Sequence, residues 1–476
     1  MSATSPDGRA DTGGLAARRR DVLVALTGDV DADPTTHVGR VHGWELHGPE
    51  VRLTTELSGV ATLVERFRFH APDGAPLVPD AHDPAVAGAL DVLALAVSVS
   101  YLKATLPGRV ELVGRPIGPA GHALLAALLT DGLAELALRA GLGPLDGTIT
   151  LGPPPATPAS SPATADTRPG TLVTVGGGKD SALSLALAAR NDPDVLALAV
   201  NARPPMERTA AWAEVGLVRV ERELDRELLA LNDRGAINGH VPITAIVMAA
   251  ASVAAALLGR GTVLVSNERS ADAATRDVDG WRVNHQYSKS RAFERLLGAA
   301  LDEAGAGVRV VSLLRPLGEL AVGRAVAREP GLVARTTSCN AAFALDGPGE
   351  GWCGRCDKCR FVQLVLAPFT PRERLVADLG FDALDDPAQV DGFARMLDPA
   401  TKPFECVGTV AEVRLALDLL ASRPDWRGTA AVRALADPDA SDLAERTATL
   451  LAADATLLPP PPYDGWLADV TREGPT

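Results

Sequence analysis

The chain has 476 residues, of which 46% are hydrophobic and 22% charged, and it carries a formal net charge of −14. This length exceeds that of one ordinary domain, so we expect two or three packed units. The acidic balance argues against a nucleic-acid partner, because such binding needs clustered Lys and Arg. The longest apolar stretch, 241–258, is rich in alanine and has a proline near its start, which indicates a buried helix and no membrane association. The N-terminal apolar run is too short for a signal peptide, so we expect a cytoplasmic protein.

The N-terminal third divides into a tail, a folded part and a linker. Residues 1–20 are small, polar and charged, which is typical of a disordered tail. Alternating apolar segments at 51–55 and 60–69 begin what we expect to be an α+β domain at 21–151. Residues 152–170 are rich in Pro, Ala, Thr and Ser, which indicates a linker.

From residue 171 onward, short apolar runs alternate with helical patterns. We expect buried strands at 172–175, 195–200, 216–220, 263–266 and 308–313. This alternation is typical of an α/β fold with a doubly wound parallel sheet, in which ligands bind beyond the carboxyl ends of the strands. We expect this domain to cover 171–368 and a helical region to follow at 369–476.

A glycine-rich turn follows the first of these strands and leads into a helix. Its residues are Gly176, Gly177, Gly178, Lys179, Asp180 and Ser181. Glycines let successive amides converge on an oxyanion, and the helix N-terminus adds positive potential. Lys179 would neutralise phosphate charge, Asp180 would hold Mg²⁺, and Ser181 would donate to a phosphate oxygen. The alternative is a plain glycine turn, which the Lys-Asp-Ser sequence between strand and helix disfavours.

This turn resembles the SGGxDS loop of the ATP pyrophosphatase superfamily. Members of that superfamily cleave ATP to AMP and pyrophosphate while they adenylate an oxygen of their substrate. Gly176 stands where the superfamily has serine, so one hydroxyl contact is lost while the amides remain. The resemblance implies a sheet of the adenine nucleotide alpha hydrolase-like (PP-loop) type, with ATP and Mg²⁺ bound at the turn.

Four cysteines form a cluster late in the predicted sheet domain, at Cys339, Cys353, Cys356 and Cys359. Disulfides are disfavoured in the cytoplasm, and this spacing brings four thiolates around one tetrahedral cation, so we expect structural Zn²⁺. A redox Cys-x-x-Cys pair and an iron–sulfur cluster are the alternatives. The pattern is similar to the CGxCxxC arrangement of 7-cyano-7-deazaguanine synthases.

Three dense polar stretches, 231–242, 266–270 and 283–293, lie between the glycine turn and the cysteines. The second of them closes a predicted strand, so Asn267 and Glu268 should lie beside the phosphate-binding turn. Their position makes Asn267 a candidate for nucleotide binding and Glu268 a candidate for catalysis.

The other two stretches supply side chains that titrate or carry positive charge, namely His240, His285 and Lys289. Taken singly, each histidine is more often a hydrogen-bonded structural residue than a catalyst. Arg315 follows the last predicted strand and could receive a carboxylate or phosphate through two parallel hydrogen bonds.

The segments GGGKDS, LNDRGAINGHVPITA, SNERS, VNHQYSKSRAFE, LLRPLGEL, WCGRCDKC and KPFECVG occur in this order. Together they are similar to the ATP-dependent UDP-N-acetylmuramoyl-L-alanyl-L-glutamate epimerase family, over about 171–408 and more loosely over the N-terminal domain. The resemblance implies that the terminal L-glutamate of this nucleotide dipeptide becomes D-glutamate during peptidoglycan synthesis. It also implies a partnership with a muramoyl ligase that adds L-glutamate.

The chemistry of such a reaction suits an acyl adenylate, which makes the Cα proton removable and releases AMP when water attacks. We take His240, Glu268, His285 and Lys289, unranked, as candidates for the two proton carriers. One alternative is a PP-loop ligase or nucleoside synthase that passes the adenylate to an amine or to sulfur. Another is a zinc-stabilised nucleotide-binding regulator without catalytic activity.

Overall fold

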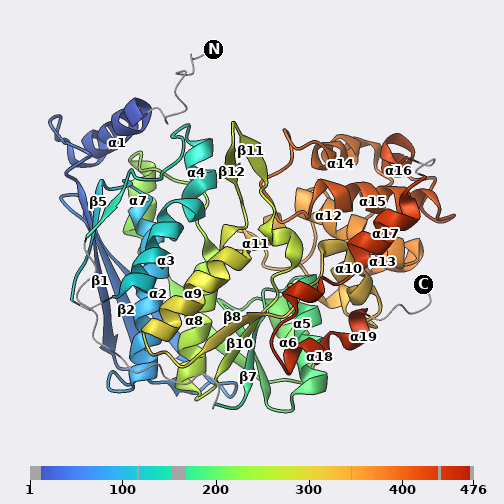
Figure 1. Cartoon of the computed structure of the whole chain (residues 1–476), viewed down its shortest axis with the longest axis horizontal. Coiled ribbons are helices and arrows are strands. Elements are labelled where there is room, and N and C mark those ends of the chain that lie inside the picture. The colour runs from blue at the N-terminus through green and yellow to red at the C-terminus, as the bar shows by residue number, and fades with distance from the viewer. Residues whose placement is uncertain (1–11, 115–116, 153–167, 345, 438–440, 472–476) are drawn as a thin grey trace. The chain divides into compact units, whose positions relative to one another are not determined.

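The computed structural model describes residues 12–471 except for 115–116, 153–167, 345 and 438–440. Most of the predicted linker and residues 1–11 of the predicted tail therefore lie outside the described residues. The described part is an α/β structure with a mixed sheet and a helical C-terminal region (Figure 1).

The chain divides into two compact units. Unit 1 comprises Met1–Pro169, Val220–Thr262 and Asp277–Val310, and unit 2 comprises Gly170–Arg219, Val263–Arg276 and Val311–Thr476. Each unit is discontinuous in sequence, because helices that follow strands of the predicted sheet domain pack with the N-terminal segment.

Unit 1 contains an antiparallel meander and a layer of apolar helices. Its strands include β1 (Val38–His47), β2 (Glu50–Leu57), β3 (Ala61–His70), β4 (Pro76–Leu77), β5 (Arg109–Leu112) and β6 (Thr150–Leu151), and its helices include α2 (Pro84–Leu102), α3 (Pro119–Leu129), α4 (Ala134–Arg139), α7 (Glu227–Asp233), α8 (Ile243–Leu257) and α9 (Arg291–Glu303). Strand β2 pairs antiparallel with β1 and with β3, whereas β5 pairs parallel with β1 and β6. Helix α2 packs against α3, α8 and α9.

Helix α2 shows how sequence dictates this layer. Asp83 caps its N-terminus by accepting hydrogen bonds from the amides of Ala85 and Val86, and Pro84 occupies the first turn, where no amide donor is needed. Two apolar segments, Pro84–Leu102 and Pro119–Arg139, have the length and hydropathy of a membrane span, but 89% and 61% of their most apolar 18-residue stretches are buried inside the protein. They pack here as core helices.

The N-terminal helix α1 (Thr12–Thr27) corrects one prediction. We expected a disordered tail through residue 20, but residues 12–20 form the first half of this helix. Leu15 and Val22 lie seven residues apart on one helical face and are both buried. The guanidinium of Arg19 donates to the carbonyl of Thr148 at 3.0 Å. The basic run that suggested disorder therefore contains a side chain that anchors the helix.

Unit 2 holds most of the strands predicted for the parallel sheet. These are β7 (Thr171–Thr174), β8 (Val195–Val200), β9 (Leu217–Glu223), β10 (Thr262–Val265) and β13 (Arg309–Ser312), of which β9, β10 and β13 cross the unit boundary. Their order in the sheet is β13-β10-β7-β8-β9, followed by β3-β2-β1-β5-β6 with β4 on β3. Strands β7 and β8 pair parallel, with Thr171 opposite Val195. The strand order reverses direction at β7, which is the hallmark of a doubly wound sheet.

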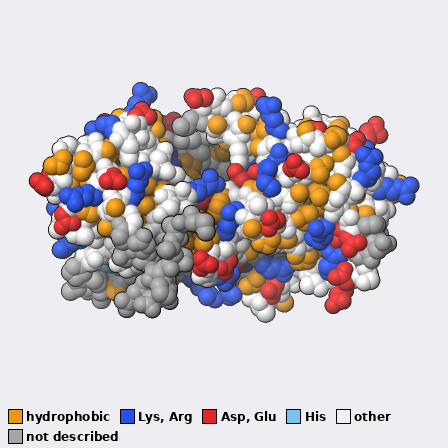
Figure 2. Space-filling model, turned by 90° about the horizontal axis from the view of Figure 1, so that it is seen from above, with side chains coloured by type: hydrophobic (Ala, Val, Ile, Leu, Met, Phe, Trp, Pro, Cys, Tyr) orange, Lys and Arg blue, Asp and Glu red, His pale blue; other side chains and the backbone are white. Residues whose placement is uncertain are grey.

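The C-terminal part of unit 2 is helical, as expected. Its main helices are α10 (Glu319–Ala327), α12 (Asp357–Leu366), α13 (Arg372–Leu379), α14 (Val390–Leu397), α15 (Val410–Ala421), α16 (Ala430–Leu435) and α17 (Leu443–Leu451), which Figure 1 draws in orange and red apart from the earlier α10. Trp426 is fully buried there, and its indole nitrogen donates to the carbonyl of Thr370 at 3.2 Å. On the face that Figure 2 shows, acidic and basic side chains are interspersed.

Candidate functional site

The glycine-rich turn lies between β7 and α5 (Lys179–Asn191), at the point where the strand order reverses. Only Gly177 needs to be glycine for its backbone, because its φ is +83° and a Cβ would come within 3.2 Å of the Thr337 carbonyl oxygen. A Cβ on Gly176 would meet nothing within 4 Å. The amide of Gly176 donates to the hydroxyl of Ser181 at 3.2 Å, so Ser181 contacts the turn that leads into its helix.

Helix α5 begins at Lys179, and its N-cap is Gly178, which has no side chain to cap the helix. Asp180 and Ser181 lie in the first turn of the helix and not at its N-cap. Amides at an uncapped helix N-terminus attract anions through their hydrogen atoms and the helix dipole. The local structure therefore suits a phosphate at the turn.

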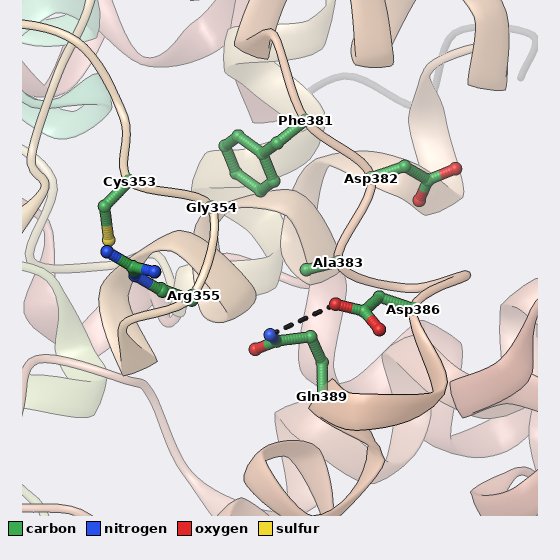
Figure 3. Close-up of a pocket in the computed structure, with 8 residues that line it drawn as sticks. All are labelled: Cys353, Gly354, Arg355, Phe381, Asp382, Ala383, Asp386 and Gln389. Carbon is green, nitrogen blue, oxygen red and sulfur yellow. Dashed lines mark hydrogen bonds between the residues drawn. The ribbon is translucent and has the colours of Figure 1, made fainter.

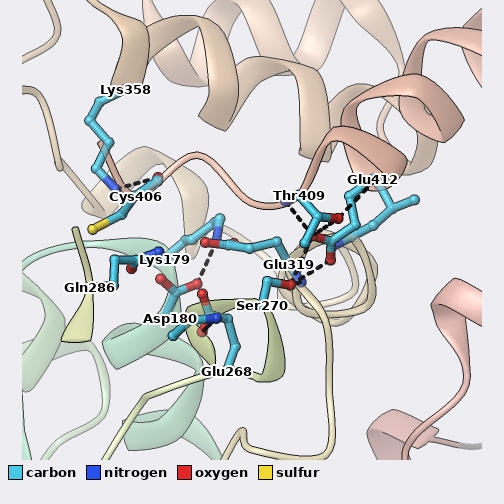
Figure 4. A network of polar contacts seen from close by, with 12 residues as sticks. Lys179, Asp180, Glu268, Ser270, Gln286, Glu319, Lys358, Cys406, Thr409 and Glu412 are labelled. Atoms are coloured by element: carbon cyan, nitrogen blue, oxygen red, sulfur yellow. Dashed lines mark hydrogen bonds and ion pairs between the residues drawn. The ribbon is translucent and has the colours of Figure 1, made fainter. Parts of the chain in front are cut away.

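Lys179 is buried, and its ammonium contacts two carboxylates (Figure 4). The Nζ atom lies 2.5 Å from Oδ1 of Asp180 and also pairs with Oε2 of Glu319, the first residue of α10. Burial alone would lower the pKa of Lys179, but the charges of Asp180 and Glu319 outweigh it and raise that pKa. Burial raises the pKa of the Glu319 carboxyl, and Lys179 opposes this rise. The ammonium of Lys179 therefore lies between two carboxylates.

The end of β10 supplies the next group of residues. The amide nitrogen of Asn267 donates to the Ser312 hydroxyl at 3.0 Å. The guanidinium of Arg315 donates to the Glu268 carbonyl at 3.0 Å and to Ser312 at 3.1 Å. Asn267, Glu268 and Arg315 are all buried. The structure thus brings the three predicted residues together through Ser312, which the sequence did not single out.

Two further side chains mark this edge of the sheet. The Glu268 carboxylate accepts from the amide of Ala271 at 3.2 Å and caps a short helix. The hydroxyl of Ser266, at the end of β10 next to β7, is buried and has no hydrogen-bond partner among the described residues. A buried hydroxyl without a partner is unfavourable by about 1–3 kcal/mol, so a ligand atom at this position would remove the penalty.

The four predicted cysteines converge on one point. The Sγ atoms of Cys339 and Cys356 lie 3.9 Å apart, those of Cys353 and Cys359 lie 3.8 Å apart, and those of Cys356 and Cys359 lie 3.4 Å apart. Four thiolates at about 2.3 Å from one tetrahedral Zn²⁺ stand about 3.8 Å from each other. The cluster therefore fits a structural zinc ion with all four positions occupied by protein.

A pocket of about 370 Å³ lies beside this cluster (Figure 3). Its lining side chains include Cys353, Arg355, Phe381, Asp382, Asp386 and Gln389. Asp386 accepts a hydrogen bond from Gln389 at 3.3 Å across its floor. Apart from Cys353, none of the residues predicted for binding or catalysis lines this pocket, so we do not place the reaction there.

In unit 1, two of the predicted proton carriers meet at a carboxylate that the sequence did not reveal. Nδ1 of His285 lies 2.5 Å from Oε2 of Glu135, and Nδ1 of His240 lies 3.7 Å from the same oxygen. Glu135 lies in α4, and only 5% of its side chain is exposed. Burial raises its pKa, but the hydrogen bond from His285 and the charges of both histidines and Arg139 outweigh burial and lower it. Glu135 is therefore ionised at neutral pH.

Lys289 lies in the same segment as His285 but outside this cluster, and its ammonium donates to Oε1 of Gln286 at 3.2 Å. Glu268 belongs to unit 2, whereas His240, His285 and Lys289 belong to unit 1. Glu135 escaped the sequence analysis because it lies within a helix and outside any recognisable motif. Glu319 lies in the segment LLRPLGEL, of which the sequence analysis singled out only Arg315. Spacing offered one signal, since Asp131 and Glu135 lie one helical turn apart.

The strand reversal at β7 and the glycine turn define a doubly wound α/β protein, a class of fold in which ligands bind beyond the carboxyl ends of the strands. Two family models match the chain, namely the MurL N-terminal domain over residues 44–313 and the MurL C-terminal domain over residues 335–450. The chain therefore belongs to the MurL family, as the sequence resemblance implied.

Three relatives share the name UDP-N-acetyl-alpha-D-muramoyl-L-alanyl-L-glutamate epimerase. The protein from Salinispora tropica is 43% identical over 73% of this chain and 76% of its own length. The protein from Micromonospora is 42% identical over 80% and 85%, and that from Xanthomonas oryzae is 39% identical over 79% and 86%. Epimerases are isomerases, so this chain belongs to a family of isomerases.

Proposed function

We propose that this protein inverts the terminal L-glutamate of UDP-N-acetylmuramoyl-L-alanyl-L-glutamate to D-glutamate, with consumption of ATP, in peptidoglycan precursor synthesis. The observation that carries the proposal is the identity of 39–43% to three proteins named for this epimerisation, over 73–80% of the chain. The reaction would take place in the cytoplasm, away from membranes and nucleic acids, and in partnership with a muramoyl ligase that adds L-glutamate.

ATP is needed because the Cα proton of the unactivated substrate is only weakly acidic. A free α-carboxylate resists loss of the Cα proton, because the product would carry two adjacent negative charges. Conversion to an acyl adenylate removes one charge and lets the carbonyl oxygen accept the other as an enolate. Pyrophosphate leaves in the first step, and water later releases AMP and the D-glutamyl product.

We assign ATP to the glycine-rich turn of a PP-loop-type sheet. Three observations support the assignment: the uncapped N-terminus of α5, the left-handed backbone of Gly177, and the buried hydroxyl of Ser266 without a partner among the described residues. Asn267 and Arg315 lie together at the neighbouring strand ends. Their amide and guanidinium groups suit phosphate or ribose oxygens.

We assign Mg²⁺ to the carboxylates beside the turn. The side chain of Asp180 is 30% exposed and Glu319 is buried, and both carboxylates contact the ammonium of Lys179. Carboxylate oxygens are hard ligands that suit Mg²⁺, and the ion held there would neutralise the charge that develops on the phosphate during adenylation. Zn²⁺ at the four cysteines would be structural, because four thiolates leave no open position.

The test is to incubate the purified protein with UDP-N-acetylmuramoyl-L-alanyl-L-glutamate, ATP and Mg²⁺ in ²H₂O. We expect D-glutamyl product with deuterium at Cα and one AMP for each product molecule, because the returning proton comes from a group that exchanges with solvent.

A ligase or nucleoside synthase would require an added amine or sulfur donor and would leave the Cα hydrogen in place. A nucleotide-binding regulator would release no AMP. ATP-dependent product without deuterium at Cα would refute the epimerase mechanism itself.

A further inference from the structure

The cluster of Glu135, His240 and His285 brings three titratable groups to one buried point of unit 1. The two imidazole rings have centroids 4.5 Å apart and are tilted by 42°. Both turn Nδ1 toward the same carboxylate oxygen, while Arg139 binds the other oxygen at 2.8 Å. An ionised carboxylate only accepts hydrogen bonds, so Nδ1 of His285 is the donor, and a neutral His285 ring carries its lone pair on Nε2.

Contacts with two other segments of unit 1 hold the loops that carry these histidines. Lys103 donates to the carbonyl of Ile237 at 3.3 Å and to the side chain of Asn238 at 3.1 Å, just before His240. On the other loop, Tyr287 hydrogen-bonds to Asp131, which lies one helical turn before Glu135. Burial raises the pKa of Tyr287, and the charge of Asp131 and this hydrogen bond raise it further. The imidazoles are therefore positioned from both sides, as catalytic groups require.

The geometry argues against a metal ion at this cluster. Two ligand atoms at about 2.1 Å from one Zn²⁺ stand about 3 Å or more from each other, whereas Nδ1 of His285 and Oε2 of Glu135 are 2.5 Å apart. The guanidinium of Arg139 also occupies the carboxylate that a cation would need. The distance between His285 and Glu135 is that of a hydrogen-bonded carboxylate–imidazole pair.

The same geometry limits what the two histidines can do in an inversion at carbon. Carriers on opposite faces need Cα between their nitrogens, with each nitrogen about 3 Å from it, which places the ring centroids roughly 8 Å apart. The observed separation is 4.5 Å. The two rings cannot face each other across the reacting carbon.

We infer that Glu135, His240 and His285 form one proton-transfer station that serves a single face of the glutamyl Cα, with Glu135 as its positioning residue. The inference rests on the proposed epimerase function. In one direction the station accepts the Cα proton, and the C–H electron pair moves into the activated carbonyl as an enolate. In the other direction it returns a solvent-derived proton to the enolate, whose electron pair re-forms the C–H bond. The transfer on the opposite face belongs to a group outside this cluster.

The test compares His240→Asn and His285→Asn with L-substrate, ATP and Mg²⁺ in ²H₂O. Three quantities are measured: pyrophosphate exchange, D-product, and deuterium in the recovered L-substrate. If the station removes the proton, both variants should show no deuterium in the L-substrate. If it returns the proton, both should show deuterium there without inversion. In either case both lose about 10²-fold or more in epimerisation and keep pyrophosphate exchange.

Two further variants test whether the cluster acts as a unit. The double variant should be no slower than the slower single variant, because members of one station are not additive. Glu135→Gln should lower kcat, leave KM and pyrophosphate exchange unchanged, and reproduce the isotope pattern of the histidine variants, which a merely structural defect would not do. The matched control is His47→Asn, which replaces a histidine that is 45% exposed on β1 and should behave as wild type.

Opposite isotope patterns in the two histidine variants would overturn the station, as would near-normal epimerisation or loss of pyrophosphate exchange in either of them. A second equivalent of transition metal that disappears in His285→Asn would also overturn it. If either Asn variant unfolds, the Gln variant at that position replaces it in the comparison. Absence of Cα deuterium in the wild type would refute the proposed function instead, so the two failures are distinguishable.

Discussion

Replacing Lys179 by methionine should destabilise the protein in a strongly pH-dependent way. The substitution removes the ammonium between Asp180 and Glu319 and leaves the Glu319 carboxyl, whose side chain is 3% exposed, without its cation. At pH 6 we expect a loss of about 2 kcal/mol in the free energy of unfolding, because charge-assisted hydrogen bonds contribute about 1.5–3 kcal/mol.

The loss should grow with pH. Burial raises the pKa of Glu319 to about 7 in the wild type, and removal of Lys179 raises it further. Above pH 7 the folded variant therefore retains a proton that the folded wild type releases, while Glu319 ionises in both unfolded chains. The variant loses about 1.4 kcal/mol more for each pH unit above 7. At pH 8.5 the total is about 4 kcal/mol, in the range for a broken buried ion pair.

The assay is urea denaturation at pH 6.0 and pH 8.5, followed by tryptophan fluorescence. The matched control is Lys103→Met, which also replaces a buried lysine. Burial lowers the pKa of Lys103 to about 8, and its described partners are a carbonyl and an amide oxygen, so no carboxyl loses its cation in this control. Adding Glu319→Gln to Lys179→Met should remove the excess pH dependence. Equal losses at both pH values in Lys179→Met would show that the ammonium does not control the ionisation of Glu319.

Three other perturbations address separate parts of the structure. Asp180→Ala should abolish formation of AMP and pyrophosphate yet leave the fold intact, because its side chain is 30% exposed; near-normal ATP cleavage would contradict the Mg²⁺ assignment. Cys356→Ser should lower both zinc content and melting temperature, since a closed metal site contributes folding free energy; metal analysis that finds iron, or no metal, in the wild type would show the zinc assignment to be wrong. Burial, with Arg19 nearby, lowers the pKa of His37 to about 4 from its ordinary 6.5. The folded state resists this protonation, so about 3 kcal/mol of stability, complete above pH 6.5, should disappear as the pH falls to 4; acid-unfolding curves of His37→Gln should lack this component.

The sequence predicted the parts of the fold whose signals are local. Strand β8 matches the predicted range 195–200, and β7, β9, β10 and β13 match within a few residues. Apolar runs this short, bounded by turn residues, are typical of buried strands. The Sγ atoms of the four cysteines converge as predicted, because a metal site of this kind can be recognised from the spacing of its ligands along the chain. Family membership also followed from ordered motifs.

The features that escaped prediction depend on contacts between distant segments. Glu135 and His285 are 150 residues apart, and Lys179 and Glu319 are 140 apart. No local pattern distinguishes these glutamates from solvated ones until the fold brings a cation or imidazole to them. The catalytic and nucleotide-binding roles of the candidate residues stay predictions, as do the domain boundaries. The four candidate proton carriers belong to two units, because 220–262 and 277–310 pack with unit 1.

The interleaving of the two units limits how this protein can be made, cut or exchanged. The chain passes from one unit to the other after Pro169, Arg219, Thr262, Arg276 and Val310. A single cut anywhere in the chain therefore releases neither unit whole, and a fragment that starts at Gly170 would carry two segments that belong to unit 1. During synthesis, unit 1 stays incomplete until Val310 has left the ribosome. For the same reason, a swap of one unit between relatives would require exchange of three separate segments.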